Sequence, residues 1–227
     1  MNVEPRNTKT RNGRLHARTR PAFLIGVLLV LGIGTGPDGG LSGSQASPSQ
    51  ATPGGDATVV LAGGCFWGVE AVFEHVRGVR SATSGFARYA NPASPVPIEA
   101  VRIVFAPSQV SQRQLLEVFF LIAHDPTTRD RQGPDSGPEY RAVVFFQSPP
   151  ERAVADSYIA ELTASHRFAR PIVTEVRALA GFTVAPDGHQ DYGSRHPDDA
   201  YVVRNDAPKL VALQQRFPQL YQKQRAP

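Results

Sequence analysis

The sequence predicts an α+β fold, a two-layer ferredoxin-like βαββαβ sandwich with an extra helix and strand. Two observations predict it. Apolar segments of strand length alternate with segments of helical spacing in the order strand, helix, strand, strand, helix, strand. The chain also has 227 residues and 41% hydrophobic content, which is enough to bury a sizeable core.

The first half of this motif begins at residue 58. TVVLA, residues 58–62, predicts a short buried strand, and two glycines then turn the chain into a helix. VRSATSGF, residues 79–86, and AVRIVF, residues 100–105, predict the next two strands. The helix that follows the first strand is indicated by a 3-4-3 spacing of apolar residues and by a glycine stop: Phe66, Val69, Phe73, Val76 and Gly78.

The second half begins with a capping box. Ser111 and Gln114 predict the start of a helix that ends before Asp125 and Pro126. YRAVVFF, residues 140–146, predicts the strand that follows. The extra elements are a helix from Ser148 to about His166, a strand at residues 172–179, and a short helix near residues 209–216.

The N-terminal region reads as an export signal. Residues 22–33 are apolar and charge-free, follow a basic start, and are too short to span a bilayer easily, which takes about 17 to 25 residues. We expect residues 1–46 to be a signal peptide, with an uncleaved N-terminal membrane anchor as the alternative. Either places the protein outside the cytoplasm, in a periplasm or on a membrane. Residues 47–57 read as a Gly/Ser/Pro-rich linker, 58–203 as the folded domain and 204–227 as a C-terminal tail.

Charge and composition exclude several classes of function. Six cations against Glu4 give residues 1–20 a net charge of +5, which leaves −1 for the rest of a chain whose total is +4. Without a basic surface on the folded part we expect no nucleic-acid partner. The six His are scattered and the single Cys has no neighbour at ligand spacing, so we expect no metal site. The sequence also contains no phosphate-binding glycine loop, so we expect no bound cofactor.

The stretch GGCFWGVE, residues 63–70, contains the only Cys and the only Trp of the chain. Cys65 is predicted at the first turn of a helix, where unpaired N–H groups and the helix dipole should lower the pKa of its thiol. Phe66 and Trp67 beside it would form an apolar cage suited to a methyl or thioether group. A lone Cys is more often a small buried hydrophobic residue than a nucleophile. The choice between these two roles for Cys65 therefore depends on the rest of the sequence.

GGCFWGVE resembles the catalytic motif of the peptide methionine sulfoxide reductases of the A type. GVRSATSGF, the segment from EAVRIVF to YRAVVFF, PIVTEV and HQDY resemble further parts of that family, so that residues 58–196 are covered. The resemblance implies an α+β two-layer fold and an oxidoreductase that reduces the S epimer of methionine sulfoxide, free or in oxidised proteins. Such an enzyme repairs proteins during oxidative stress.

The resemblance also implies roles for individual residues. Cys65 would attack the sulfoxide sulfur and become a sulfenic acid, and Glu99 would protonate the departing oxygen. Tyr140 would hold that oxygen, and Phe66 and Trp67 would bind the methyl group. Two further residues match positions that contact substrate in the family: Asp135 and His189.

The sequence departs from the family pattern at two points. Only ASPVPI separates Asn91-Pro92 from Glu99, where the family has a longer loop with a second oxygen-binding tyrosine; Tyr89 is the nearby candidate to replace it. Removing one such donor typically costs about two to four kcal/mol of transition-state stabilisation. The tail also lacks a resolving cysteine, so we expect an external thiol, small or from a thioredoxin-like or glutaredoxin-like protein, to regenerate Cys65.

Two alternatives remain open from the sequence. The shortened loop suggests a relative that binds methionine sulfoxide or a protein partner without turnover. Cys65 and His189 could instead be the nucleophile and base of an acyl transfer, although Glu99 has no clear task in that reaction.

Overall fold

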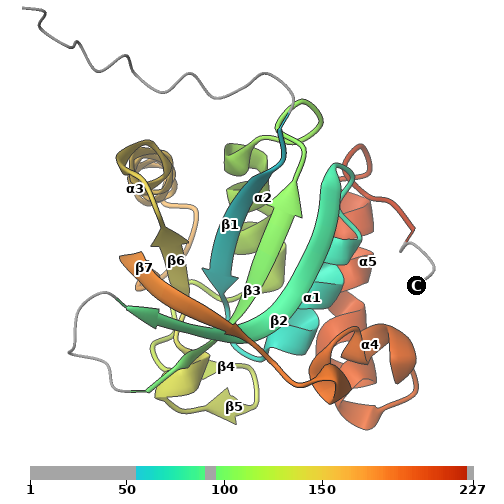
Figure 1. Ribbon diagram of the computed structural model, residues 1–227. Helices are drawn as coiled ribbons and strands as arrows, with labels where there is room; N and C mark the ends of the chain where they lie inside the picture. Colours follow the sequence, from blue (N-terminus) through green and yellow to red (C-terminus); the bar gives the residue numbers. More distant parts are fainter. Residues whose placement is uncertain (1–54, 90–95, 224–227) are drawn as a thin grey trace, which may run out of the picture. The chain divides into compact units, whose positions relative to one another are not determined.

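Five strands form the central sheet. The computed structural model describes residues 55–89 and 96–223. Two of the strands are buried on both faces, at residues 59–62 and 143–145. The strands are β1 (Ala57–Ala62), β2 (Val79–Tyr89), β3 (Ile98–Phe105), β6 (Val143–Phe146) and β7 (Glu175–Val184), and Figure 1 shows them crossing the centre of the molecule.

The sheet is closed. β1 pairs antiparallel with β3 and β6, and β2 pairs antiparallel with β3 and β7. The parallel pairing of β6 with β7 completes the circuit β1-β3-β2-β7-β6. The predicted α+β class is confirmed, and the five strands close into one continuous sheet with helices packed on it.

The closure comes from the length of β7. Its first residues pair with β6 and its last residues, Leu179 to Val184, pair with β2. The sequence prediction ended this strand at residue 179, the first of the residues that pair with β2. A strand that pairs with both edges leaves neither edge unpaired.

Helices cover the sheet. α1 (Phe66–Glu74) packs on β2 and β3, and α5 (Ala207–Arg216) packs against α1, which Figure 1 shows as two neighbouring helices. α2 (Gln112–Val118) continues into a π-helical turn at Phe119–Ala123, and α3 (Pro149–Ala164) packs on α2. The capping box at Ser111 and the cap at Ser148 form as predicted.

The strand predicted at residues 140–146 begins three residues later. Pro138–Tyr140 forms a 3-10 turn, in which the N–H of Arg141 bonds the carbonyl of Pro138, and β6 starts only at Val143. The turn packs against β3. Tyr140 therefore lies outside the sheet and next to the strand that bears Glu99.

The remaining elements are short. They are β4 (Arg131–Gln132), β5 (Asp135–Ser136), a 3-10 turn at Asp187–His189, α4 (Tyr192–Arg195) and a π-helical turn at Val202–Asp206 that runs into α5. The predicted signal or anchor and most of the linker lie outside the described residues. Within the described part of the chain, no helix combines the length and the apolar character that crossing a membrane requires.

Candidate active site

Cys65 lies between β1 and α1, as the N-cap residue of the helix. Gly64 before it has a φ of +89°, and a Cβ atom there would lie 2.4 Å from the Cβ of Gln132. Only glycine accommodates both the conformation and the close contact. This turn holds the half-buried thiol at the start of a 9-residue helix, where backbone N–H groups lack partners within the helix.

The pKa of the Cys65 thiol is raised to about 12, contrary to the expectation from its helix position. Burial is the largest cause, and the carboxylates of Glu99 and Asp206 add to it. The backbone N–H of Trp67 and the Tyr201 hydroxyl lower the pKa, but less than burial raises it. The resting group is therefore a neutral thiol.

Glu99 is the second residue of β3 and faces the start of α1. Its Oε2 accepts a hydrogen bond of 3.1 Å from the N–H of Phe66, the residue after Cys65. Burial raises the pKa of Glu99 to about 7, with smaller contributions from Asp135 and Glu139, and the Phe66 N–H opposes the rise. A carboxyl group with this pKa carries a proton in a large fraction of molecules at neutral pH, as a general acid must.

Asp135 and Tyr140 lie near Cys65 and Glu99. Burial raises the pKa of Tyr140 to about 12, and electrostatic interactions with Glu99, Asp135 and Cys65 also raise it, so Tyr140 lies within interaction distance of all three groups. The structure thus brings together the predicted nucleophile, the predicted acid and the predicted oxygen-binding hydroxyl.

A second tyrosine occupies this site that sequence reasoning missed. The hydroxyl of Tyr201 donates a hydrogen bond of 2.5 Å to Oδ2 of Asp135 and also interacts with the Cys65 thiol. Tyr201 comes just before the turn at Val202–Asp206, and Asp199 caps it by accepting from the N–H of Tyr201. Such a cap indicates a helical turn in the sequence, but nothing local indicates that the turn faces Cys65.

The aromatic residues form one cluster beside the thiol. The centroid of the Phe66 ring lies 5.4 Å from that of His189. Because Phe66 is only 3% exposed, it belongs to the core and offers little open surface to a substrate. Trp67 stacks on Tyr192 at 3.6 Å between ring centroids and lies 5.9 Å from His189. The edge of Tyr201 meets the Trp67 ring at 5.8 Å. Phe66 and Trp67, the two residues predicted to form the apolar cage, therefore form it together with residues 189–192, the HQDY segment.

A buried carboxyl group holds that segment on α1. Glu70 is 1% exposed and accepts from the N–H groups of Ser84, at 2.9 Å, and Asp191, at 3.0 Å. The Gln190 amide group bonds both the N–H and the carbonyl of Ser84. These bonds fix His189 against Phe66 and Trp67, whereas no hydrogen bond joins His189 to Cys65 among the described residues.

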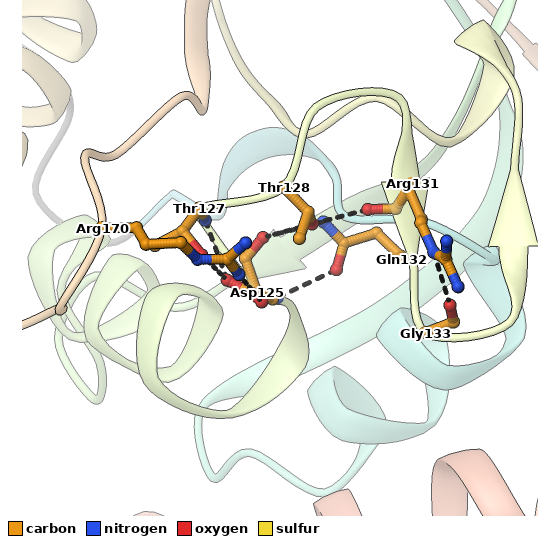
Figure 2. Close-up of polar contacts among 7 residues, drawn as sticks. All are labelled: Asp125, Thr127, Thr128, Arg131, Gln132, Gly133 and Arg170. Carbon is orange, nitrogen blue, oxygen red and sulfur yellow. Dashed lines mark hydrogen bonds and ion pairs between the residues drawn. The ribbon is translucent and has the colours of Figure 1, made fainter.

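A cavity of about 260 Å³ opens beside the thiol. Cys65, Asp135, Tyr201 and Lys209 are among its lining residues. Residues 122–125 and 132–135 form one wall of the cavity, and Figure 2 draws the loop that joins these two segments. In the part of the chain that is described, no group of three or more His, Cys, Asp or Glu residues is arranged to hold a metal ion.

Gln132 fixes this wall. Its side-chain oxygen accepts from the N–H of Asp125 at 2.9 Å, and its amide nitrogen donates to the Asp125 carbonyl at 2.8 Å and to the Thr128 hydroxyl at 3.2 Å (Figure 2). Arg170 pairs with the Asp125 carboxylate at 3.3 Å. Because the same Gln132 packs on Gly64, the cavity wall and the turn before Cys65 are positioned together.

Comparison with known proteins decides the family. The sequence profile of the family described as Peptide methionine sulfoxide reductase matches residues 57–221. The chain is 40% identical over 181 residues to Peptide methionine sulfoxide reductase MsrA 2 of Mesorhizobium japonicum, covering 76% of this chain and 92% of that one. It is 42% identical over 173 residues to MsrA of Ralstonia nicotianae, covering 70% and 90%. The chain belongs to the peptide methionine sulfoxide reductase family.

Solved structures agree with this assignment. Reduced Mxr1 of Saccharomyces cerevisiae superimposes with a TM-score of 0.55 at 26% identity, over 63% of this chain and 87% of that one. Methionine sulfoxide reductase A of Corynebacterium diphtheriae gives 0.52 at 30% identity, over 63% and 76%. The protein is an oxidoreductase, a methionine sulfoxide reductase of the A type.

Tyr89 does not take the place of the tyrosine that the shortened loop lacks. Its ring packs on Phe145 at 5.7 Å and beneath Arg177, and its hydroxyl interacts with Arg141. It belongs to a hydrophobic cluster separate from the one that Cys65 joins. Tyr201 is the second hydroxyl at the reductase site. Residues 90–95 of the shortened loop lie outside the described residues.

Proposed function

We propose that this reductase converts the S epimer of methionine sulfoxide, free or in oxidised proteins, to methionine through a sulfenic acid on Cys65. One observation carries the proposal. The N–H of Phe66 holds the Glu99 carboxyl group at the start of α1, next to Cys65, and that carboxyl has a pKa of about 7. A thiol and a proton donor side by side are what sulfoxide reduction needs, because oxygen leaves sulfur only after it gains protons.

The chemical step balances with these two groups. The Cys65 sulfur attacks the sulfoxide sulfur and loses its proton, while the sulfur–oxygen electron pair moves to oxygen, which takes the proton of Glu99. The hydroxide released in this way attacks the Cys65 sulfur, and the new sulfur–sulfur bond breaks with its electron pair on the methionine sulfur. The thioether leaves and Cys65 becomes a sulfenic acid. The Cys65 sulfur is oxidised by two electrons and the methionine sulfur is reduced by two.

The surrounding residues bind the substrate in this proposal. Tyr140 donates a hydrogen bond to the oxygen, and Asp135 orients the substrate at the cavity. Trp67 and His189 contact the methyl group, with Phe66 supporting both rings from the core. The ring distances of 5.4 and 5.9 Å from His189 to Phe66 and Trp67 support this assignment.

Regeneration needs an external thiol, since Cys65 is the only cysteine in the sequence. A first thiol attacks the sulfenic sulfur, releases water and leaves a mixed disulfide on Cys65. A second thiol then releases Cys65 and forms a disulfide between the two reductant sulfurs. A small thiol or a thioredoxin-like or glutaredoxin-like protein supplies both. A disulfide-linked homodimer as an obligatory intermediate would contradict this cycle.

The proposal extends to export of the enzyme and to a ferredoxin-like unit within its sheet. The basic start and apolar residues 22–33 support export, with the enzyme periplasmic or anchored to a membrane and repairing proteins oxidised there. Four of the strands, ordered β6-β1-β3-β2 and antiparallel throughout, support a ferredoxin-like unit to which β7 is added.

Trapping of the intermediate tests this function. The full chain is incubated with methionine S-sulfoxide without reductant, then with a dimedone-type probe specific for sulfenic acids, and the modified residue is identified by mass spectrometry. We expect Cys65 to be labelled only after exposure to the sulfoxide. The absence of label on a folded protein with a free thiol would contradict the proposal, and Cys65→Ser serves as the control for probe specificity.

A further inference from the structure

The resting thiol poses a question that the reaction itself does not answer. Cys65 is protonated, yet its sulfur must lose that proton during attack. Glu99 cannot accept it, because Glu99 has to carry its own proton to the substrate oxygen. A second proton acceptor is therefore required. This inference rests on the proposed function.

We propose that Tyr201 and Asp135 form the path by which the Cys65 proton leaves. Tyr201 is a catalytic residue on this path, since it lines the cavity beside Cys65 and its hydroxyl interacts with the reacting thiol, and Asp135 is the acceptor at the end of the path.

The geometry connects the three groups in series. The Tyr201 hydroxyl donates to Oδ2 of Asp135 over 2.5 Å and interacts with the Cys65 thiol at the same time. A hydroxyl has one proton to donate and lone pairs to accept with, so the order of donation runs from sulfur to tyrosine to carboxylate. All three residues line the same cavity, although they come from distant parts of the chain.

The fold holds Tyr201 in this position through contacts unrelated to the hydroxyl. Oδ1 of Asp199 accepts from the N–H of Tyr201 at 2.8 Å, and the Asn205 side chain donates to the Tyr201 carbonyl at 3.0 Å. The Trp67 ring meets the edge of the tyrosine ring. These contacts survive removal of the hydroxyl, so the hydroxyl can be tested alone.

The other charged groups around the thiol do not fit the role of acceptor. Asp206 accepts a hydrogen bond from Lys209 at 3.3 Å and is 2% exposed, so a proton placed there could not readily reach solvent. Lys209 is a cation and accepts nothing. Tyr140 is a neutral donor. Asp135 is half-buried in the cavity wall, from which a proton can return to water.

The step can be written with its protons in place. As the bond between the Cys65 sulfur and the substrate sulfur forms, the S–H bond breaks and its proton moves to the Tyr201 oxygen. The original Tyr201 proton moves to Asp135, and Glu99 protonates the substrate oxygen. Solvent later takes the proton from Asp135 and returns one to Glu99, so that the net reaction remains a thiol plus a sulfoxide giving a sulfenic acid plus a thioether.

The test uses Tyr201→Phe in the full chain, with two readouts. The first is the rate of Cys65 alkylation by iodoacetamide as a function of pH, which needs no sulfoxide and has no background because Cys65 is the only cysteine. The second is the single-turnover rate of reduction of a methionine S-sulfoxide peptide. We expect alkylation to shift to higher pH, because the hydroxyl that has taken the sulfur's proton donates to the thiolate and so lowers the thiol pKa. We expect reduction to slow at least tenfold.

Matched variants complete the experiment. Tyr221→Phe is the control: this tyrosine stacks on His75 and pairs with Val76, outside the cavity lining, and should leave both readouts unchanged. Asp135→Asn should slow reduction as Tyr201→Phe does, and the double variant should be little slower than either alone, because the two residues serve one path.

Three results would overturn the proposal. Tyr201→Phe with wild-type alkylation and reduction would show that the hydroxyl has no role. Slower reduction with an unchanged alkylation profile would show that it does not act through the thiol. Fully multiplicative effects of Tyr201→Phe and Asp135→Asn would show that they act separately. A wild type that fails to reduce sulfoxide would instead contradict the proposed function, while the alkylation readout would still report on the Tyr201 contact.

Discussion

Replacing Glu99 with Gln should slow the enzyme and stabilise it at the same time. Gln keeps an oxygen that accepts from the N–H of Phe66 but has no proton to give to the sulfoxide. General acids of this kind contribute about 10² to 10⁴ in rate, so we expect single-turnover reduction to fall by that factor.

The gain in stability follows from the same raised pKa. Moving the pKa of Glu99 from 4.5 to about 7 corresponds to roughly 3 kcal/mol against the ionised form, or about 1–2 kcal/mol after allowance for solvent screening at a half-buried site. Because the folded protein binds this proton more tightly than the unfolded chain, stability from Glu99 is lost as the pH rises from 4.5 to about 7. The Glu99→Gln variant has no carboxyl group to ionise at this position, so its stability does not fall in this pH range.

The assay pairs rapid-quench single turnover with urea unfolding at pH 8 and at pH 5. We expect the free energy of unfolding to rise by about 1–2 kcal/mol at pH 8 and by less at pH 5. Glu117→Gln, at a surface pair with Arg113 on α2, is the control and should change neither quantity substantially. A Glu99→Gln protein that reduces sulfoxide at the wild-type rate, or that is destabilised at pH 8, would refute the reasoning.

Three further predictions follow from the site. At low substrate concentration the wild-type rate should fall as the pH rises above about 7, because Glu99 loses its proton while Cys65, of pKa about 12, still reacts as a thiol that gives up its proton during the attack; a rising profile in stopped-flow assays would count against this. Gly64→Ala should lower the free energy of unfolding by more than about 1 kcal/mol in urea titrations, since its φ is +89° and the added Cβ meets Gln132. Tyr89→Phe should reduce sulfoxide within about twofold of wild type, because surface or remote changes rarely affect transition-state binding, and a large loss would return Tyr89 to the site.

Part of this account could be predicted from local sequence. The glycine turn, Cys65, Phe66 and Trp67 are contiguous, and the capping signals at Ser111 and Ser148 are read from neighbours within three residues. Local patterns of this kind also fixed the order of strands and helices. The local motif GGCFWGVE, residues 63–70, indicated the chemistry of the site through its resemblance to the family.

The rest depends on contacts between distant segments. The sequence gives no sign that β7 is long enough to pair with both β6 and β2, because pairing is decided by the edges it meets. Tyr201 reaches Cys65 only because the segment that it begins packs, together with α5, against α1. The predicted direction of the Cys65 pKa shift was wrong for a similar reason. The helix start lowers the thiol pKa, but burial and the carboxylates of Glu99 and Asp206, which lie on other elements, raise it more.

The most direct test of the central claim is a single-turnover assay of the full chain with separated S and R epimers of a methionine sulfoxide peptide, run beside Cys65→Ser. We predict one equivalent of methionine from the S epimer, none from the R epimer, and none from either with the serine variant. Equal reaction of both epimers, or reduction that persists without Cys65, would contradict the account.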